Sequence, residues 1–207
     1  MNFDGPALDA LKVRAKKQLR SRARALRGAI PRRALKVRSD AVVARLEALE
    51  PALLPSPLRS VALFWPMEDK GEVDLRAFDA SCRARGLAVY YPFFGETLES
   101  SGFARVDRVS ELEERGRGFA EPDESAPRAE PGEVDLIVVP ALAVCESGHR
   151  LGYGAGFYDG VLPRFRPPAK TIVVAYDFEL LSELPTSDHD VACDLVVTDQ
   201  RTLVPRV

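Results

Sequence analysis

Cysteine and histidine are scarce in this sequence, and their scarcity excludes several kinds of site. The 207 residues include three cysteines and two histidines. Cys82, Cys145 and Cys193 are odd in number, lie far apart and form no CxxC pair, so neither a disulfide framework nor a cysteine zinc site is indicated. Two histidines are too few for a histidine-rich metal site. The compartment that we expect is a reducing cytoplasm.

Long apolar runs are also missing. The N-terminal stretch MNFDGPALDALKVRAKKQLR has no apolar core of signal-peptide length. No later segment approaches the roughly 20 apolar residues that span a bilayer. We therefore expect neither export nor a membrane partner.

The net charge is close to zero, at −2, but the cations gather in one segment. Residues 12–38 hold twelve Lys or Arg and no acid, which leaves the rest of the chain acidic. By composition alone, a solvated basic face or a nucleic-acid patch explains such a segment. A nucleic-acid role lacks interleaved aromatic residues and a recognised motif, and it would require steeply salt-dependent binding to RNA. We therefore expect no nucleic-acid partner.

Two helices are predicted before residue 50. The string LDALKVRAKKQLRSRARALR, from Leu8 to Arg27, repeats apolar residues at helical spacing with basic residues around them, which predicts an amphipathic helix. Pro31 interrupts this pattern, and a second helical pattern continues to Pro51. The proline-rich stretch PALLPSPLRS that follows is predicted to be a linker.

Short apolar runs after residue 60 predict buried strands. These runs are SVALFWP, LAVYYPFF, VDLIVVPALAV, TIVVAYDF and DLVVTD, separated by polar, helix-compatible segments. Their alternation with helices predicts an α/β fold with a mainly parallel sheet, helices on both faces and right-handed crossovers. The acidic stretch EPDESAPRAEPGE is predicted to be a long surface loop. We therefore expect one domain over 1–207, with basic helices in 8–50 and an α/β core in 60–200.

A glycine-rich segment follows the third of these runs. In CESGHRLGYGAGFYDG, glycines at 152, 154 and 156 let backbone N–H groups approach an anion, and a following helix directs its positive end the same way. No Gly-Lys-Ser/Thr follows, and the spacing differs from GxGxxG, so the two common nucleotide motifs are excluded. A tight turn that needs glycine only for its dihedral angles stays an alternative. Arg150 and Asp159 favour nucleotide binding, because a guanidinium binds phosphate oxygens and a carboxylate binds magnesium.

GHRLGYGAGFYDG closely resembles the RLGxGxGYYD signature of the 5-formyltetrahydrofolate cyclo-ligase family, also called methenyltetrahydrofolate synthetases. Shorter matches occur in the expected order: KKQLR resembles the family's K-x-x-L-R helix, WPMEDKGEVD its substrate-binding strand end, GFAEPD its glycine-to-EP loop and LPTSDHDVACDLVVTD its closing PxxxHD segment. The resemblance covers nearly the whole chain. It implies a single three-layer α/β domain of the kind shared with sugar-phosphate isomerases and coenzyme A transferases.

The resemblance also implies roles for individual residues. The catalytic residues that it implies are Arg150 and Tyr158, and the magnesium ligands are Asp159 and Asp190. The implied ATP-binding residues are Lys16, Arg20, Arg150, Leu151, Gly152, Tyr153, Gly154, Ala155, Gly156, Phe157 and Tyr158. The implied substrate-binding residues are Trp65, Glu72, Tyr153, Gly154, Ala155, Gly156 and Phe157.

Several of these residues have a plainer explanation when each is considered alone. Lys16 and Arg20 lie four apart on one helical face, where two cations meet either one polyphosphate or only solvent. An isolated Trp65 at the end of an apolar run is typical of core packing. Glu72 alone indicates a surface loop acid, and Asp190 a helix cap or exposed acid.

The activity that the resemblance implies is the ATP- and Mg²⁺-dependent conversion of 5-formyltetrahydrofolate to 5,10-methenyltetrahydrofolate, with release of ADP and phosphate. In that reaction the formyl oxygen takes the γ-phosphoryl group, N10 attacks the activated carbon and phosphate leaves. The expected cofactor is Mg²⁺ with ATP as co-substrate, and the expected partners of a monomeric chain are these small molecules. Such a ligase belongs to folate-dependent one-carbon metabolism.

Two departures from the family pattern support an alternative. Val144-Cys145 stands where the family commonly has Phe-Asp, which removes a carboxylate, and Ala155 stands where glycine or lysine is frequent. The alternative is a cyclo-ligase-like protein that binds a nucleotide or a folate without catalysis. Cys145 itself, without an evident histidine partner, is predicted to be a buried thiol at a strand end.

Overall fold

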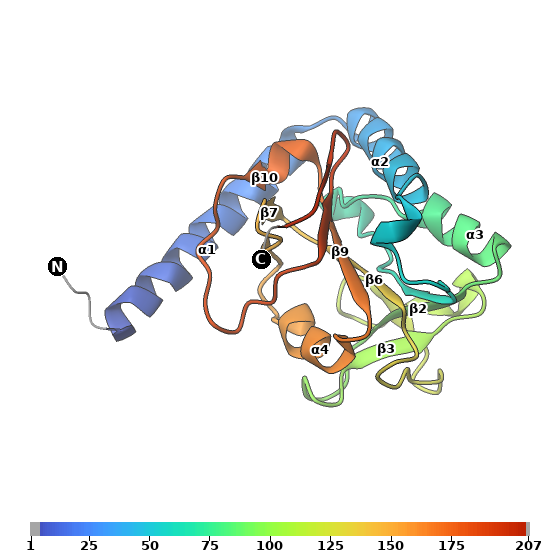
Figure 1. The fold of residues 1–207 in the computed structure, drawn as a ribbon. Helices are drawn as coiled ribbons and strands as arrows, with labels where there is room; N and C mark the ends of the chain where they lie inside the picture. The colour runs from blue at the N-terminus through green and yellow to red at the C-terminus, as the bar shows by residue number, and fades with distance from the viewer. Residues whose placement is uncertain (1–4, 206–207) are drawn as a thin grey trace.

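A seven-stranded sheet forms the centre of the computed structural model, which describes residues 5–205 (Figure 1). The strand order is β12-β11-β9-β6-β1-β2-β3, and the five strands from β11 to β2 are parallel. An antiparallel strand closes each edge. The seven strands are β1 (Ser60–Ala62), β2 (Ala88–Phe93), β3 (Gly102–Arg105), β6 (Leu136–Pro140), β9 (Lys170–Val174), β11 (Leu195–Val197) and β12 (Thr202–Leu203).

The helices pack on both faces of this sheet. The helices are α1 (Gly5–Ala29), α2 (Arg32–Glu47), α3 (Arg76–Ala84) and α4 (Phe157–Phe165), with short 3₁₀ turns η1 (Pro51–Leu53), η2 (Glu68–Lys70), η3 (Val109–Glu111) and η4 (Asp177–Glu179). Side chains of α2 and α3 share one buried cluster with one face of the sheet, and side chains of α4 share a second cluster with the other face.

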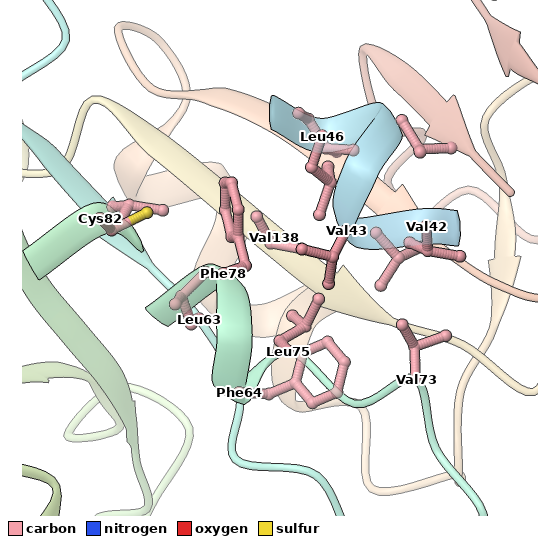
Figure 2. Close-up of a cluster of buried hydrophobic side chains, with 14 of the residues drawn as sticks. Val42, Val43, Leu46, Leu63, Phe64, Val73, Leu75, Phe78, Cys82 and Val138 are labelled. Atoms are coloured by element: carbon pink, nitrogen blue, oxygen red, sulfur yellow. The ribbon is translucent and has the colours of Figure 1, made fainter. Parts of the chain in front are cut away.

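Alternation along each strand divides the core between these faces. In β6, Val138 belongs to the cluster under α2 and α3, whereas Ile137 belongs to the cluster under α4. Figure 2 shows Val138 in the first cluster between side chains of the two helices, among them Val43 and Phe78. Strands buried on both faces explain why the sequence shows nearly unbroken apolar runs rather than alternation with polar residues.

Two small sheets complete the fold. β7 (Ala143–Cys145) pairs with β8 (Arg150–Leu151) and β10 (Leu180–Leu181), and β4 (Leu112–Glu114) pairs with β5 (Ala120–Pro122). The run VDLIVVPALAV therefore contains two strands of different sheets. It was expected to form one strand, and that expectation is wrong.

The predicted α/β class with a mainly parallel sheet is confirmed, and every predicted apolar run contains a strand. The stretch 121–133 is mostly irregular, as expected of a surface loop, with Ala104 and Arg128 forming an isolated bridge. Residues 1–4 and 206–207 of the proposed domain lie outside the described part. Among the described helices, none is long and apolar enough to cross a membrane.

The first helix exists as predicted, but the most buried of its described side chains is basic rather than apolar. Leu8, Leu11 and Leu26 are 43%, 50% and 45% exposed. Arg27 is buried instead, at 2% exposure. Figure 1 shows the N-terminal half of α1 extending away from the body of the molecule. Leu19 is half-buried, so basic and apolar side chains together hold this helix against the protein.

Candidate functional site

The predicted site residues gather near the carboxyl ends of the parallel strands. The chain leaves β1 toward Trp65 and Glu72, leaves β6 toward β7 and the glycine loop, and leaves β9 toward η4. Ligands of open α/β sheets bind outside this edge because the loops of several strands meet there. Here the term glycine loop means residues 152–156.

The glycine loop joins β8 to the start of α4. Gly154 has φ +110° and Gly156 has φ +69°, backbone conformations that favour glycine. Gly156 precedes the first turn of α4, and among residues 5–205 no side chain caps that turn. The N–H groups at this helix end remain available to an anion, and the aligned peptide dipoles favour one there.

A stripe of basic side chains on α1 contacts the glycine loop and the 187–190 turn. Lys16 Nζ lies 2.5 Å from Asp190 Oδ2, and Arg20 Nε donates to the carbonyl of Gly152 at 2.9 Å. One helical turn further, Arg24 donates to the carbonyl of Tyr153 at 3.3 Å. Lys16 and Arg20 are thus engaged with the loops of the site and are not a solvated face.

Arg150 connects α4 to the segment that follows Asp190. Its Nη1 donates to the carbonyl of Val191 at 2.5 Å and its Nη2 donates to Asp159 Oδ1 at 2.8 Å. The amide of Val191 also donates to Asp159 Oδ1, at 3.2 Å. Since Asp190 precedes Val191, the structure brings the two predicted magnesium ligands into one neighbourhood, each beside a cation.

Asp190 is held in its ionised form. Burial raises the pKa of its carboxyl, but the ammonium of Lys16 and the amide of Ser187 outweigh burial and keep that pKa below its ordinary value. Among the described residues, no three His, Cys, Asp or Glu side chains form a ready metal cluster. Mg²⁺ in phosphoryl-transfer sites commonly takes one or two carboxylates and completes its shell with phosphates and water, so this pair fits that ion.

Glu72 is buried, so the alternative of a surface loop acid is wrong. It is 7% exposed and its Oε2 accepts the amide of Met67 at 2.8 Å. Burial raises the pKa of the Glu72 carboxyl, and the Met67 amide, the Arg27 guanidinium and the Tyr153 hydroxyl reduce that rise. The segment between β1 and α3 therefore places an acid of raised pKa beside Tyr153 of the glycine loop.

The hydroxyl of Tyr158 is buried and has no hydrogen-bond partner within residues 5–205. Burial raises the pKa of this phenol, and its ring lies 5.8 Å from the guanidinium carbon of Arg150. A buried polar group without a partner costs free energy, so it indicates a ligand or a water molecule in the functional state. The role of Tyr158 toward the substrate stays a prediction.

The contacts of Trp65 and Cys145 in the structure are mainly packing contacts in buried surroundings. The Trp65 ring packs against the core cluster under α2 and α3 and meets Tyr91 edge-on, with 6.3 Å between ring centroids. Its folate role stays a prediction. Cys145 is 2% exposed at the end of β7, so the prediction of a buried strand-end thiol is confirmed. Its sulfur lies 3.1 Å from Ser147 Oγ.

A family model described as the 5-formyltetrahydrofolate cyclo-ligase family matches residues 12–199. The chain belongs to this family. A Mycolicibacterium smegmatis 5-formyltetrahydrofolate cyclo-ligase is 53% identical over 73 residues, an alignment that covers 35% of this chain and 38% of that relative. A mouse 5-formyltetrahydrofolate cyclo-ligase is 24% identical over 147 residues, covering 67% of this chain and 72% of that relative.

Solved structures of cyclo-ligase relatives agree with the fold. The NMR structure of Aquifex aeolicus 5,10-methenyltetrahydrofolate synthetase is 29% identical, with a TM-score of 0.78 and 93% of each chain covered. A 5,10-methenyltetrahydrofolate synthetase from Mycoplasma pneumoniae is 21% identical, with a TM-score of 0.69 over 89% of this chain and 98% of the other. The predicted family, an enzyme family of ligases acting on folate, is confirmed.

The sequence did not identify one part of this cyclo-ligase-family site. Arg27 Nε lies 2.6 Å from Glu179 Oε1, its Nη2 donates to the carbonyl of Ala141 at 2.5 Å, and its Nη1 meets the hydroxyl of Tyr153 at 3.2 Å. It thereby joins α1, η4, the end of β6 and the glycine loop. The signal was available, because residue 27 continues the helical stripe of Lys16 and Arg20 at i+4 or i+3 steps.

Glu72→Gln is expected to make stability less dependent on pH. Because burial raises the pKa of Glu72, its contribution to stability is fully present below the ordinary value of 4.5 and is lost as pH rises through the raised pKa. The amide oxygen of Gln still accepts the Met67 N–H. In thermal melts from pH 4.5 to 8, the Tm of the variant should therefore increase relative to the Tm of the parent protein as pH rises.

Exposed Glu50→Gln is the matched control for this measurement, since it removes one carboxylate without relieving burial. A Tm difference between Glu72→Gln and the parent that stays constant over the whole pH range would contradict the raised pKa.

Proposed function

We propose that the protein catalyses the ATP- and Mg²⁺-dependent conversion of 5-formyltetrahydrofolate to 5,10-methenyltetrahydrofolate, with release of ADP and phosphate. Membership of the cyclo-ligase family supports this activity. The observation that carries the finer proposal is the meeting of three segments. Lys16 and Arg20 of α1 contact the Asp190 turn and the glycine loop, and Arg150 joins Asp159 to the segment that follows Asp190.

The chemistry requires activation of an unreactive carbonyl. The N-formyl carbon is a poor electrophile because nitrogen donates electron density into the carbonyl. Transfer of the γ-phosphoryl group of ATP to the formyl oxygen creates a leaving group, N10 then attacks the carbon, and phosphate departs as the methenyl bridge forms. No protein nucleophile is needed, so the protein contributes position and charge.

The residues divide these tasks. Backbone N–H groups of the glycine loop and of the first turn of α4 bind phosphate oxygens, and Lys16 and Arg20 add two cations from one face of α1. Glu72 binds the pterin. The Tyr158 hydroxyl, buried without a partner in the described structure, donates to a substrate oxygen.

Mg²⁺ would be held by Asp159 and Asp190, where it would neutralise phosphate charge. In the structure those carboxylates are neutralised by Arg150 and Lys16. Lys16, once displaced from Asp190, would be free to bind a phosphate oxygen.

Purified protein mixed with 5-formyltetrahydrofolate and MgATP is expected to form the methenyl product in step with ADP. The product is followed by its near-ultraviolet absorbance and ADP by a coupled assay. Asp190→Asn should require a higher Mg²⁺ concentration for half-maximal rate, whereas the exposed Asp188→Asn, two residues away, should behave as the parent protein. Equal rates with and without Mg²⁺ would contradict the assigned metal role.

Binding without turnover would support the alternative of a non-catalytic relative. One observation favours that alternative: Cys145 replaces the family's frequent carboxylate and is buried at the end of β7, next to the turn that leads to Arg150. If ATP and folate bind but no methenyl product appears, Cys145→Asp is the first variant to test for gain of activity.

A further inference from the structure

A tight turn joins β7 to β8 beside the segment that follows Asp190. Within this turn, the amide of Gly148 donates to the carbonyl of Cys145 at 2.9 Å, and the amide of Cys145 donates to the carbonyl of His149 at 3.0 Å. The carbonyl of Gly148 accepts the amide of Cys193 at 2.9 Å. Gly148 has φ +81°, and a Cβ on it would lie 2.4 Å from the carbonyl oxygen of Cys193. The turn therefore packs directly against the segment that follows Asp190, and only glycine permits this approach.

Three side chains of the turn form a chain of hydrogen bonds. Cys145 Sγ lies 3.1 Å from Ser147 Oγ, and Ser147 Oγ lies 3.0 Å from His149 Nδ1. We assign the single hydroxyl proton of Ser147 to the bond with the imidazole nitrogen, because sulfur is the weaker acceptor. Nδ1 of His149 is then the acceptor nitrogen, and Nε2 carries the proton of the neutral ring.

The Nε2–H group of His149 is available to a ligand. His149 is half-buried, and within residues 5–205 its Nε2 has no hydrogen-bond partner. Burial raises the pKa of the Asp190 carboxyl, and Lys16 and a positive charge on His149 are among the influences that lower it, so the imidazole lies in the neighbourhood of Asp190. Asp190 Oδ2 already accepts the Lys16 ammonium and the amide of Ser187. His149 therefore offers an unused donor beside the proposed nucleotide site.

The charges around this donor indicate the class of ligand. Lys16 and Arg150 bring two cations to the same neighbourhood, where they pair with Asp190 and Asp159. A further N–H donor among these groups suits an anion with several oxygens, and hydrogen bonds to an ionised acceptor are stronger than neutral ones. A polyphosphate has such oxygens, and a neutral imidazole binds one of them without adding charge to the site.

We propose that the Nε2–H group of His149 donates to a phosphate oxygen of the bound nucleotide, with the ring held in place by Ser147 and Cys145. This inference rests on the proposed function, which supplies ATP and ADP at the glycine loop. His149 contacts the ligand, whereas Ser147 and Cys145 act through it as positioning residues. The thiol that replaces the family's frequent carboxylate thereby supports phosphate binding through the turn.

The test is calorimetric titration with ADP and with inorganic tripolyphosphate, without Mg²⁺ and at about pH 8, where imidazole is neutral. His149→Ala is expected to weaken binding of both ligands by the same factor, roughly 5- to 20-fold, for the loss of one half-exposed hydrogen bond to a charged group. His149→Gln should recover part of the affinity, because its carboxamide nitrogen lies about where Nε2 does. Glu146→Gln, an exposed neighbour on the same turn, is the control and should bind both ligands at least as tightly as the parent protein.

Variants of Ser147 test the positioning of the ring. Ser147→Ala leaves the imidazole free to rotate and should weaken binding of both ligands by about 2- to 5-fold, the cost of ordering one side chain on binding. Ser147→Thr keeps the hydroxyl and should restore the affinity. Weaker binding of ADP but not of tripolyphosphate in His149→Ala would assign His149 to the nucleoside and overturn the proposal. A loss that appears only with Mg²⁺ would assign it to Asp190 and overturn the proposal as well.

The binding result does not depend on turnover, so the two proposals fail separately. Absence of methenyl product together with the expected binding pattern would reject the proposed function and keep the phosphate contact. Methenyl formation by His149→Ala with the parent's KM for ATP and the parent's affinity for ADP would reject the phosphate contact and keep the proposed function.

Discussion

Arg150→Ala is expected to lower kcat/KM for ring closure by about 10²- to 10³-fold, the usual cost of removing one preorganised charged donor. The Arg150 side chain is 3% exposed and fixes both Asp159 and the carbonyl of Val191. Its loss removes one of the links between Asp159 and the segment that follows Asp190. Arg150→Lys should be intermediate, because an ammonium keeps the charge but cannot reach both partners as a guanidinium does.

Arg166→Ala is the matched control for this prediction. Arg166 also binds a carbonyl and a carboxylate of the same segment, those of Ala192 and Asp194, but it lies after α4 and away from the glycine loop. It should lose stability without a comparable loss of activity. Turnover of Arg150→Ala within tenfold of the parent, in a protein that still melts cooperatively, would contradict the role assigned to Arg150.

Arg27→Met is expected to lower the free energy of unfolding by about 3–5 kcal/mol, the usual cost of breaking a buried ion pair from one side. Arg27 and Glu179 have side chains 2% and 1% exposed, so the variant leaves a carboxylate buried without its counter-ion. In a protein of this size the loss corresponds to a fall in Tm of about 10 °C. Denaturant titration followed by circular dichroism measures it.

Two companion variants test whether the loss of stability comes from the unpaired buried charge of Glu179. Arg27→Met/Glu179→Gln should recover a large part of the loss, because glutamine still accepts the Tyr176 amide but carries no charge. Lys36→Ala, which breaks an exposed ion pair with Asp40, should change stability by less than about 1 kcal/mol. If Arg27→Met is as stable as Lys36→Ala, the buried pair does not anchor α1.

The strands were predictable because they are buried on both faces. Such strands consist of apolar residues over their whole length, and the runs around β1, β2, β6, β9 and β11 stand out in the sequence. The short edge strands β3 and β12 carry mixed residues and gave no comparable signal. The division between β6 and β7 also escaped prediction, because both strands are buried and periodicity does not mark the bend between them.

Helix α1 shows most clearly what local spacing predicts and what depends on the tertiary structure. Its spacing predicted a helix and placed Lys16 and Arg20 on one face. An amphipathic helix normally buries its apolar residues, yet Leu8 and Leu11 are exposed and Arg27 is buried. A periodic pattern indicates which residues share a face, but burial of that face depends on the partner surface, which here consists of carbonyls and carboxylates.

The sequence by itself determined the fold class, the glycine loop and the family, because these depend on residues close together along the chain. Only the tertiary structure decided which distant charges meet. Lys16 contacts Asp190, Arg27 contacts Glu179, and Glu72 becomes buried beside Tyr153, although more than 75 residues separate the members of each of these contacts. Local spacing carries no record of those meetings, since they follow from the order of the parallel strands, which brings their carboxyl ends to one edge of the sheet.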